Sequence, residues 1–143
     1  MTRIDFYVLD DSGVQAQNML ACRIANKAYD KQQHVYIHTN DQGQSDGLDQ
    51  FMWAYQDGSF LPHCQHQAKE STDTPIVIGH DHEPDDKTDV LINLANTVPS
   101  FYSRFERVIE LVTGDEPTRE KARARFKYYR DRGYPIETHK LAG

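Results

Sequence analysis

The sequence predicts an α/β fold, in which a mainly parallel central sheet is flanked by helices. Short apolar runs of strand length alternate with longer amphipathic segments of helical period, which is the pattern of such folds. The first unit is strand, turn, helix, strand, and a crossover through a helix implies parallel pairing with a right-handed connection. At 143 residues, with no linker rich in Pro, Gly or Ser, the chain is expected to form a single domain over residues 1–143.

The first half of the chain contains two predicted strand and helix pairs. We expect a strand over 4–9, a helix over about 14–31, a strand over 34–39 and a helix from 41 onward. The inward stripe of the first helix comprises Val14, Ala21, Ile24, Ala25 and Ala28. Another stripe carries Arg23, Lys27 and Lys31 at i, i+4 and i+8, and we interpret it as a solvated face rather than a binding row.

The second half continues the alternation. A polar connection over 65–73 precedes predicted strands over 75–79 and 90–94, a short helix or turn over 98–105, a strand over 107–112, a last helix and a terminal strand over 134–138. The last helix is expected to begin after Asp115 as its cap, with Pro117 tolerated in the first turn. Gly133 followed by Pro135 predicts its end.

The basic residues of the chain are concentrated in the last helix. Residues 119–132 hold seven of the sixteen Lys and Arg, against two acids, so this stretch carries +5 and the remainder −11 to give the net −6. Such a patch indicates one docking site for one anionic partner rather than general affinity for nucleic acid. The acidic remainder also argues against a surface that wraps duplex DNA.

Two adjoining stripes run along that helix. The basic stripe comprises Arg119, Arg123, Lys127 and Arg130. The apolar stripe comprises Ala122, Phe126 and Tyr129 at i, i+4 and i+7, so that Phe126 borders the basic row. The alternative interpretation is an ordinary amphipathic helix whose cations are solvated and complement the helix dipole.

A second candidate surface surrounds the only tryptophan. The apolar stripe of the second helix comprises Leu48, Phe51, Met52 and Tyr55. Trp53 points away from that stripe, and the loop after it carries Phe60, Leu61 and Pro62. Together they indicate an exposed apolar surface, unless the loop folds back to cover Trp53.

The sequence contains no recognisable catalytic motif. The first strand-to-helix turn reads LDDSGVQ, without phosphate-cradling glycines, and there is no GxSxG. The one enzymatic candidate is a metal site, for which the ligands would come from His80, His82, Asp85, Asp86, His63, Cys64 and His66. Spacing alone supports it weakly, because His and Asp are ordinary surface residues in polar segments. We therefore expect no metal and no cofactor, with a metal-dependent hydrolase as the alternative.

The cellular compartment is predicted from the absence of a signal peptide pattern and of a membrane-spanning run. The N-terminus has no charged-then-apolar signal pattern, and no apolar run approaches the roughly 20 residues of a membrane span. We expect a soluble, cytoplasmic protein that does not contact membranes. Cys22 and Cys64 stand apart without a CxxC pairing, so both are expected to be free thiols.

Several segments, in their order and spacing, carry a family resemblance. They read DFYVLDD, ACRIANKAY, LDQFMWAY with SFLPH, DVLINLA, FERVIELV and ARARFKYYRDRGYPIETHKL. Along nearly its whole length the chain resembles the chi subunit family of bacterial DNA polymerase III holoenzyme. The resemblance implies a Rossmann-like fold without the nucleotide-binding motif. It also implies a subunit with no catalysis of its own in a DNA-directed DNA polymerase.

The resemblance further implies an adaptor with two partners. One is the psi subunit, which leads to the clamp loader, and the other is the acidic, Phe-ending C-terminal tail of single-stranded-DNA-binding protein. By resemblance Arg123, Phe126 and Lys127 match tail-binding positions, and the tail-binding set as a whole comprises Val112, Arg123, Phe126, Lys127, Tyr129 and Arg130. The psi-facing set comprises Trp53, Phe60, Leu61 and Pro62. Nucleic acid is then contacted only indirectly.

A direct single-strand binder is the remaining alternative. In that case Phe126, Tyr128 and Tyr129, interleaved with cations, would stack bases. Two of these rings lie on the apolar stripe that the helix needs for its core, and the acidic remainder of the chain would repel a strand. The sequence therefore favours the adaptor.

Overall fold

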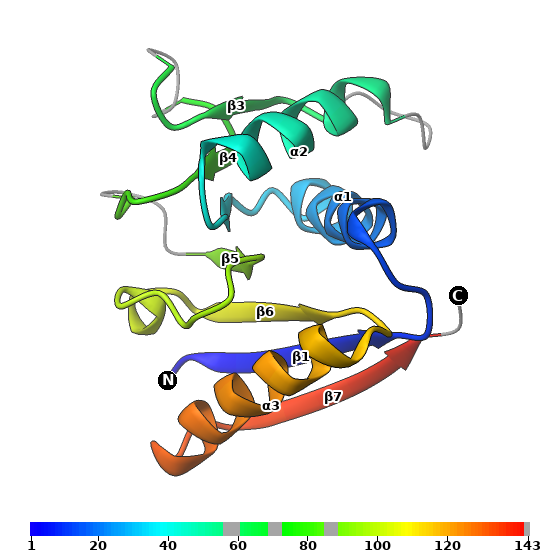
Figure 1. The fold of residues 1–143 in the computed structure, drawn as a ribbon. Helices are drawn as coiled ribbons and strands as arrows, with labels where there is room; N and C mark the ends of the chain where they lie inside the picture. The colour runs from blue at the N-terminus through cyan, green and yellow to red at the C-terminus, as the bar shows by residue number, and fades with distance from the viewer. Residues whose placement is uncertain (56–60, 69–72, 85–88, 142–143) are drawn as a thin grey trace.

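The computed structural model describes residues 1–55, 61–68, 73–84 and 89–141. Within them the chain forms one seven-stranded sheet and three α-helices (Figure 1). The elements are β1 (Arg3–Leu9), α1 (Val14–Asp30), β2 (Val35–His38), α2 (Gln42–Ala54), β3 (His63–Gln65), β4 (Ile76–Gly79), β5 (Val90–Asn93), the 3-10 turn η2 (Tyr102–Arg104), β6 (Arg107–Val112), α3 (Glu116–Asp131) and β7 (Ile136–Leu141).

The sheet is parallel at every pairing. Its strand order is β3-β4-β2-β5-β6-β1-β7, and each neighbouring pair runs in the same direction. β1 lies between β6 and β7, with Ile4 opposite Val108 on one side and Ile136 on the other. The predicted α/β class and parallel sheet are thus confirmed.

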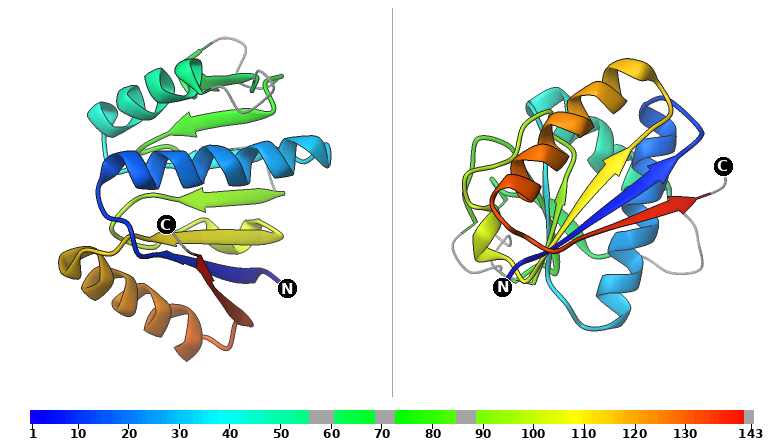
Figure 2. Two further views of the ribbon diagram at one scale, coloured as in Figure 1. Left: turned by 90° about the vertical axis from the view of Figure 1, so that its right-hand side faces the viewer. Right: turned by 90° about the horizontal axis from the view of Figure 1, so that it is seen from below.

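Helices cover both faces of the sheet (Figure 2). Buried residues of α1 and α2 pack with Val35 and Ile37 of β2 in one core. Alternate residues of the same strand point the other way, so Tyr36 packs in a second core with Ala122 and Tyr129 of α3. This alternation is that of a strand buried on both faces, and α3 covers the face opposite to α1 and α2.

Three sequence predictions need correction. The segment expected as a polar connection begins within β3, a three-residue edge strand whose pairing with β4 satisfies its backbone although its side chains are polar. The terminal strand runs to Leu141 rather than 138, because its pairing with β1 continues to that residue. Val14 is 69% exposed rather than inward, as the first residue of α1.

The two cysteines are free, as expected. Cys22 is fully buried, and its desolvation raises the pKa of the thiol to about 12, which makes it unreactive. Among the described residues, no helix is both long and apolar enough to cross a bilayer.

Candidate functional site

Local hydrogen bonds determine where α3 begins and ends. Asp115 caps its first turn by accepting from the backbone N–H of Thr118 at 3.3 Å, and the Thr113 hydroxyl donates to the same carboxylate at 2.8 Å. Hydrogen bonds from Thr118 and Thr113 hold the pKa of Asp115 below its usual value. At the other end Gly133 takes a left-handed φ of 81°, the conformation that favours glycine. The predicted limits of the helix are confirmed.

A buried polar network fixes α3 to the sheet. The Arg125 guanidinium donates to Glu110 of β6 at 2.8 Å, and the Tyr129 hydroxyl donates to the same carboxylate at 2.6 Å. Asn93 of β5 adds a third donor at 2.9 Å. Burial raises the pKa of Glu110, although Arg125 and the hydrogen-bond donors oppose the shift. These contacts determine which side chains of α3 face outward.

Tyr129 therefore belongs to the core rather than to a binding surface. Its side chain is fully buried and its hydroxyl is held by Glu110. Tyr129 was predicted as a member of the tail-binding set, and the structure corrects this, because a partner cannot reach a buried side chain. Arg125 is also buried, at 6% exposed, and cannot contribute to an exposed basic row.

An open pocket lies between α3 and the strands beneath its first half. We call it the α3 pocket; its volume is about 200 Å³, and it is lined by Phe6, Val8, Val112, Arg119, Ala122, Arg123, Phe126 and Thr138. The ring of Phe126 is half-buried and packs on Phe6, with the ring centroids 5.4 Å apart. The lining is mainly apolar, and Arg119 and Arg123 contribute the guanidinium groups in it.

The cations of α3 differ in their relation to this pocket. Arg123 lines it and forms an exposed ion pair with Glu116 at 2.6 Å. Arg119 also lines it, and its Nε is buried without a hydrogen-bond partner among the described residues. Lys127 and Arg130 are exposed and lie outside the lining. Of the predicted tail-binding residues, the structure thus gathers Val112, Arg123 and Phe126.

Several lining residues were not predicted as site residues. Phe6 and Val8 alternate on β1 and were read only as a buried strand, and Thr138 comes from β7. Pairing of β1 with β7 brings them together, with Phe6 opposite Thr138. Arg119 was detectable, because it stands one turn before Arg123 on the basic stripe.

The Trp53 surface is exposed at the end of α2. Trp53 is 60% exposed, and its ring lies 4.8 Å from that of His63 in edge strand β3. Leu61, which was expected on the surface, is 2% exposed and packs in the core under α1 and α2. Pro62 is half-buried, and Phe60 lies outside the described residues. Of the predicted psi-facing residues that the structure describes, Trp53 and Pro62 are therefore the ones accessible to a partner.

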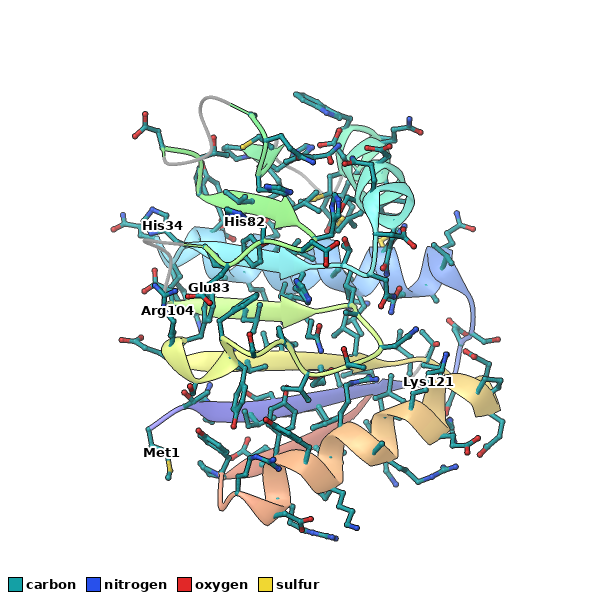
Figure 3. All side chains as sticks on the ribbon, turned by 60° about the vertical axis from the view of Figure 1, so that its left-hand side comes forward. Met1, His34, His82, Glu83, Arg104 and Lys121 are labelled. Atoms are coloured by element: carbon teal, nitrogen blue, oxygen red, sulfur yellow. The ribbon has the colours of Figure 1, made fainter. Side chains whose placement is uncertain are left out.

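Histidines from two segments, which follow β3 and β4, form a cluster. The rings of His66 and His82 stack with centroids 4.4 Å apart, and His80 meets His66 edge-on at 5.4 Å. The segment holding His82 is fixed by the Tyr36 hydroxyl, which donates to the His82 carbonyl at 3.0 Å, and by an ion pair between Glu83 and Arg104 (Figure 3). Asp85 and Asp86 lie outside the described residues. These rings pack on one another rather than converge on a common ion.

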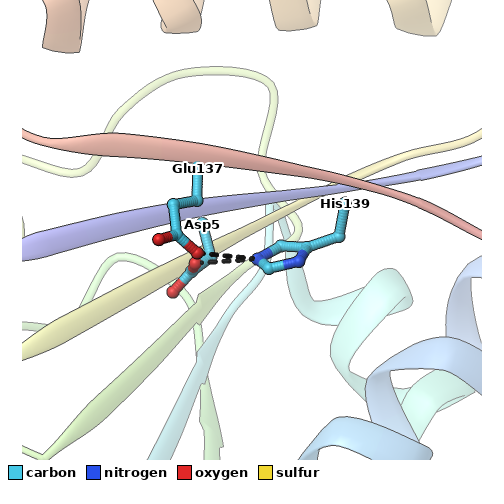
Figure 4. Close-up of side chains that lie close together, drawn as sticks. All are labelled: Asp5, Glu137 and His139. Carbon is cyan, nitrogen blue, oxygen red and sulfur yellow. Dashed lines mark hydrogen bonds and ion pairs between the residues drawn. The ribbon is translucent and has the colours of Figure 1, made fainter.

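Among the described residues, one group brings three potential metal-ligand atoms within 4.8 Å of one another: Asp5, Glu137 and His139 (Figure 4). His139 Nε2 lies 2.9 Å from one oxygen of Asp5, while Arg107 and Arg3 donate to the other at 2.7 and 3.3 Å. Burial alone would raise the pKa of Asp5, but hydrogen bonds from Arg107 and His139 outweigh it and hold the pKa below its usual value. Asp5 is thus already neutralised by guanidinium groups, and the cluster ties β1, β6 and β7 together.

Comparison with known proteins shows similarity along nearly the entire chain. Residues 1–137 match the family described as DNA polymerase III chi subunit, HolC. The DNA polymerase III subunit chi of Pseudomonas aeruginosa is 38% identical over 141 residues, covering 99% of this chain and 98% of the relative. The protein of the same name from Escherichia coli K12 is 29% identical over 143 residues, covering 96% and 97%. That from Haemophilus influenzae is 26% identical over 137 residues, covering 95% of each.

Proposed function

Because the chain belongs to the family of DNA polymerase III chi subunits, we propose that it is a non-catalytic adaptor of that polymerase in the cytoplasm. Its α3 pocket binds the acidic, Phe-ending C-terminal tail of single-stranded-DNA-binding protein. A second surface binds the psi subunit and links the tail to the clamp loader. Nucleic acid is contacted only through these partners.

The observation that carries the proposal is the composition of the α3 pocket. A tail that ends in Phe presents an aromatic ring and a terminal carboxylate on the same residue. The ring needs an apolar floor, which Val8, Val112 and Phe126 supply. The carboxylate needs a cation at the rim, which Arg119 and Arg123 supply, and charge-assisted hydrogen bonds are about twice as strong as neutral ones.

The cations beyond the pocket extend the same surface. Lys127 stands one turn after Arg123 on α3, and Arg130 follows near the end of the helix. Both side chains are exposed. Acidic residues that precede the terminal Phe would meet these cations, with a salt-dependent contribution because exposed charges are screened.

The psi-binding role rests on the Trp53 surface. An aromatic side chain that is 60% exposed is a common anchor of protein interfaces. Its contact with His63 holds the ring over the edge strand β3, and Pro62 adjoins that strand. This surface lies at the opposite end of the sheet order from the α3 pocket, so both partners would bind at once.

Titration with synthetic peptides tests the adaptor function. An acidic peptide ending in Phe should bind the full chain, and the same peptide with Ala as its last residue should bind much more weakly. A single-stranded oligonucleotide should bind weakly or not at all. Equal binding of the Phe and Ala peptides would show that the pocket does not bind the terminal Phe. Tight binding of the oligonucleotide without binding of the peptide would show that the protein binds single-stranded DNA directly.

A further inference from the structure

A larger cavity lies on the other face of the sheet, between α1 and the strands β1 and β7. We call it the α1 groove; its volume is about 290 Å³, and it is lined by Tyr7, Leu20, Arg23, Ile24, Lys27, Ala28, Lys31, Gln33, Arg107 and Leu141. None of these residues belongs to the α3 pocket or to the Trp53 surface. The volume is close to the lower end of small-molecule pockets, about 300 to 1,000 Å³.

Three cations on the wall of this groove lack partners. Arg23, Lys27 and Lys31 recur every fourth residue, so they step along α1 at about 6 Å intervals. Each lines the cavity and is exposed. Within the described chain no ion pair or hydrogen bond engages any of the three side chains. This row was predicted to be a solvated face, whereas in the structure it lines a cavity.

The helix dipole accounts for only part of this row. Cations at the C-terminal turns of a helix complement its dipole, and this explains the positions of Lys27 and Lys31 near the end of α1. The helix dipole does not explain Arg23, which lies in the middle of the helix. Like charges at i, i+4 also repel one another, so a polyanion in the groove would remove an unfavourable interaction that the free protein retains.

A fourth cation is held in place on the opposite wall. The Arg107 Nε donates to Asp5 at 2.7 Å, and its Nη2 donates to the Tyr7 hydroxyl at 2.8 Å. These bonds fix the guanidinium plane before any ligand arrives. A fixed donor loses less conformational entropy on binding than a mobile one.

The end of α1 is shaped in an uncommon way beside the groove. Gln32 has a φ of 62°, a left-handed conformation that side-chain-bearing residues rarely adopt. The Gln33 N–H then donates back to the Ala28 carbonyl at 3.0 Å, which closes the helix and leaves Gln33 in the cavity lining. Gln33 thus contributes to the lining a side-chain amide, a group that can hydrogen-bond a base or a ribose.

We propose that the α1 groove binds a nucleoside diphosphate. The two phosphates carry about three negative charges, which match the three unpartnered cations, and lysine is a common phosphate ligand as a point charge. The base packs against Tyr7, Ile24 and Leu141. The site differs from the nucleotide site of doubly wound folds, which uses glycines at the carboxyl ends of strands, because here the phosphates are met by side chains of one helix.

The test compares ligands and matched variants of the full chain by titration calorimetry. ADP should bind, pyrophosphate should bind at least tenfold more weakly, and adenosine should not bind measurably. Lys27→Gln together with Lys31→Gln should weaken ADP binding at least tenfold, while the control Lys121→Gln, an exposed lysine on α3 (Figure 3), should leave it unchanged. Binding of the Phe-ending peptide, measured on the same double variant, should be retained.

Four results would overturn the proposal. The first is that the wild type does not bind ADP, and the second is that Lys121→Gln loses as much ADP binding as the double variant. The third is equal affinity for pyrophosphate and ADP. The fourth is that a thymidine oligonucleotide binds more tightly than ADP and that the double variant abolishes this oligonucleotide binding. The third would reduce the site to a phosphate site, and the fourth would assign it to single-stranded DNA. None of them bears on the α3 pocket, which the peptide titration tests separately.

Discussion

The guanidinium of Arg125 lies 2.8 Å from the carboxylate of Glu110 in the core, with the two side chains 7% and 0% exposed. Removing one partner of a buried ion pair leaves the other charge without compensation, which costs about 3 to 5 kcal/mol. Arg125→Met should therefore destabilise the protein by about that amount, measured as the free energy of unfolding in urea.

The matched control is Arg123→Met, on the same helix and also paired with a glutamate, but exposed. It should change the unfolding free energy little, because exposed pairs contribute little to stability. Similar losses of unfolding free energy in the two variants would show that burial does not determine how much Arg125 contributes to stability.

The histidine cluster should make stability depend on pH. Desolvation is the main cause that lowers the pKa of His38 and of His66 below 6.5, and the neighbouring His82 and His80 lower that of His66 further. A histidine with a lowered folded pKa contributes stability that is present above the unfolded value and is lost as pH falls through the folded one. The urea concentration at the midpoint of unfolding should therefore decrease as the pH is lowered from 7 to 5.

His66→Gln should flatten that dependence, because it removes one of the two histidines whose pKa is lowered. His34→Gln, on an exposed histidine, serves as the control and should keep the slope of the wild type. An unchanged slope in His66→Gln would assign the acid sensitivity to other groups.

Trp53→Ala should weaken binding to psi while the fold stays intact. The side chain is 60% exposed, so its truncation removes interface rather than core, and aromatic anchors often contribute 2 kcal/mol or more, roughly thirty-fold in affinity. Calorimetric titration with psi and a thermal melt measure the two effects. Met19→Ala, on another exposed apolar side chain, should affect neither, and unfolding of Trp53→Ala would show that the ring stabilises the fold.

Local signals predicted much of the fold. Asp115, Pro117 and Gly133 gave both ends of α3, because caps and breakers act within a few residues. Strand β3 could not be predicted, because its polar residues become a strand only through pairing with β4. The same limit applies to Val14, since helical period alone does not show where the sheet beneath a helix ends.

The candidate site was predicted in part for the same reason. Arg123 and Phe126 follow from the two stripes of one helix, and both line the pocket. The burial of Arg125 was not predicted, because its partner Glu110 is fifteen residues away on β6. Leu61 looked exposed beside Trp53, although it packs in the core. Contacts between distant segments, which periodicity does not report, decided both cases.

Lys127→Ala gives a prediction for the outer part of the basic stripe. Because Lys127 is exposed and lies outside the pocket lining, we expect it to meet acidic residues of the tail rather than the terminal carboxylate. Its loss should weaken tail binding by up to about tenfold at low salt, with little effect on thermal stability, and the affinity of the variant should fall less steeply with salt. An identical salt dependence in variant and wild type would exclude Lys127 from the contact.

The central claim, that the α3 pocket captures the terminal carboxylate of a Phe-ending tail, is tested most directly by a double-mutant cycle. Arg123→Ala in the protein and amidation of the peptide C-terminus should each weaken binding by about tenfold, and the two changes together should cost little more than either alone, because both remove the same contact. Arg132→Ala, an exposed cation stacked on Tyr128 at the end of the helix, should leave affinity and the effect of amidation unchanged. Full additivity of Arg123→Ala and amidation, or unchanged affinity for Arg123→Ala, would contradict the account.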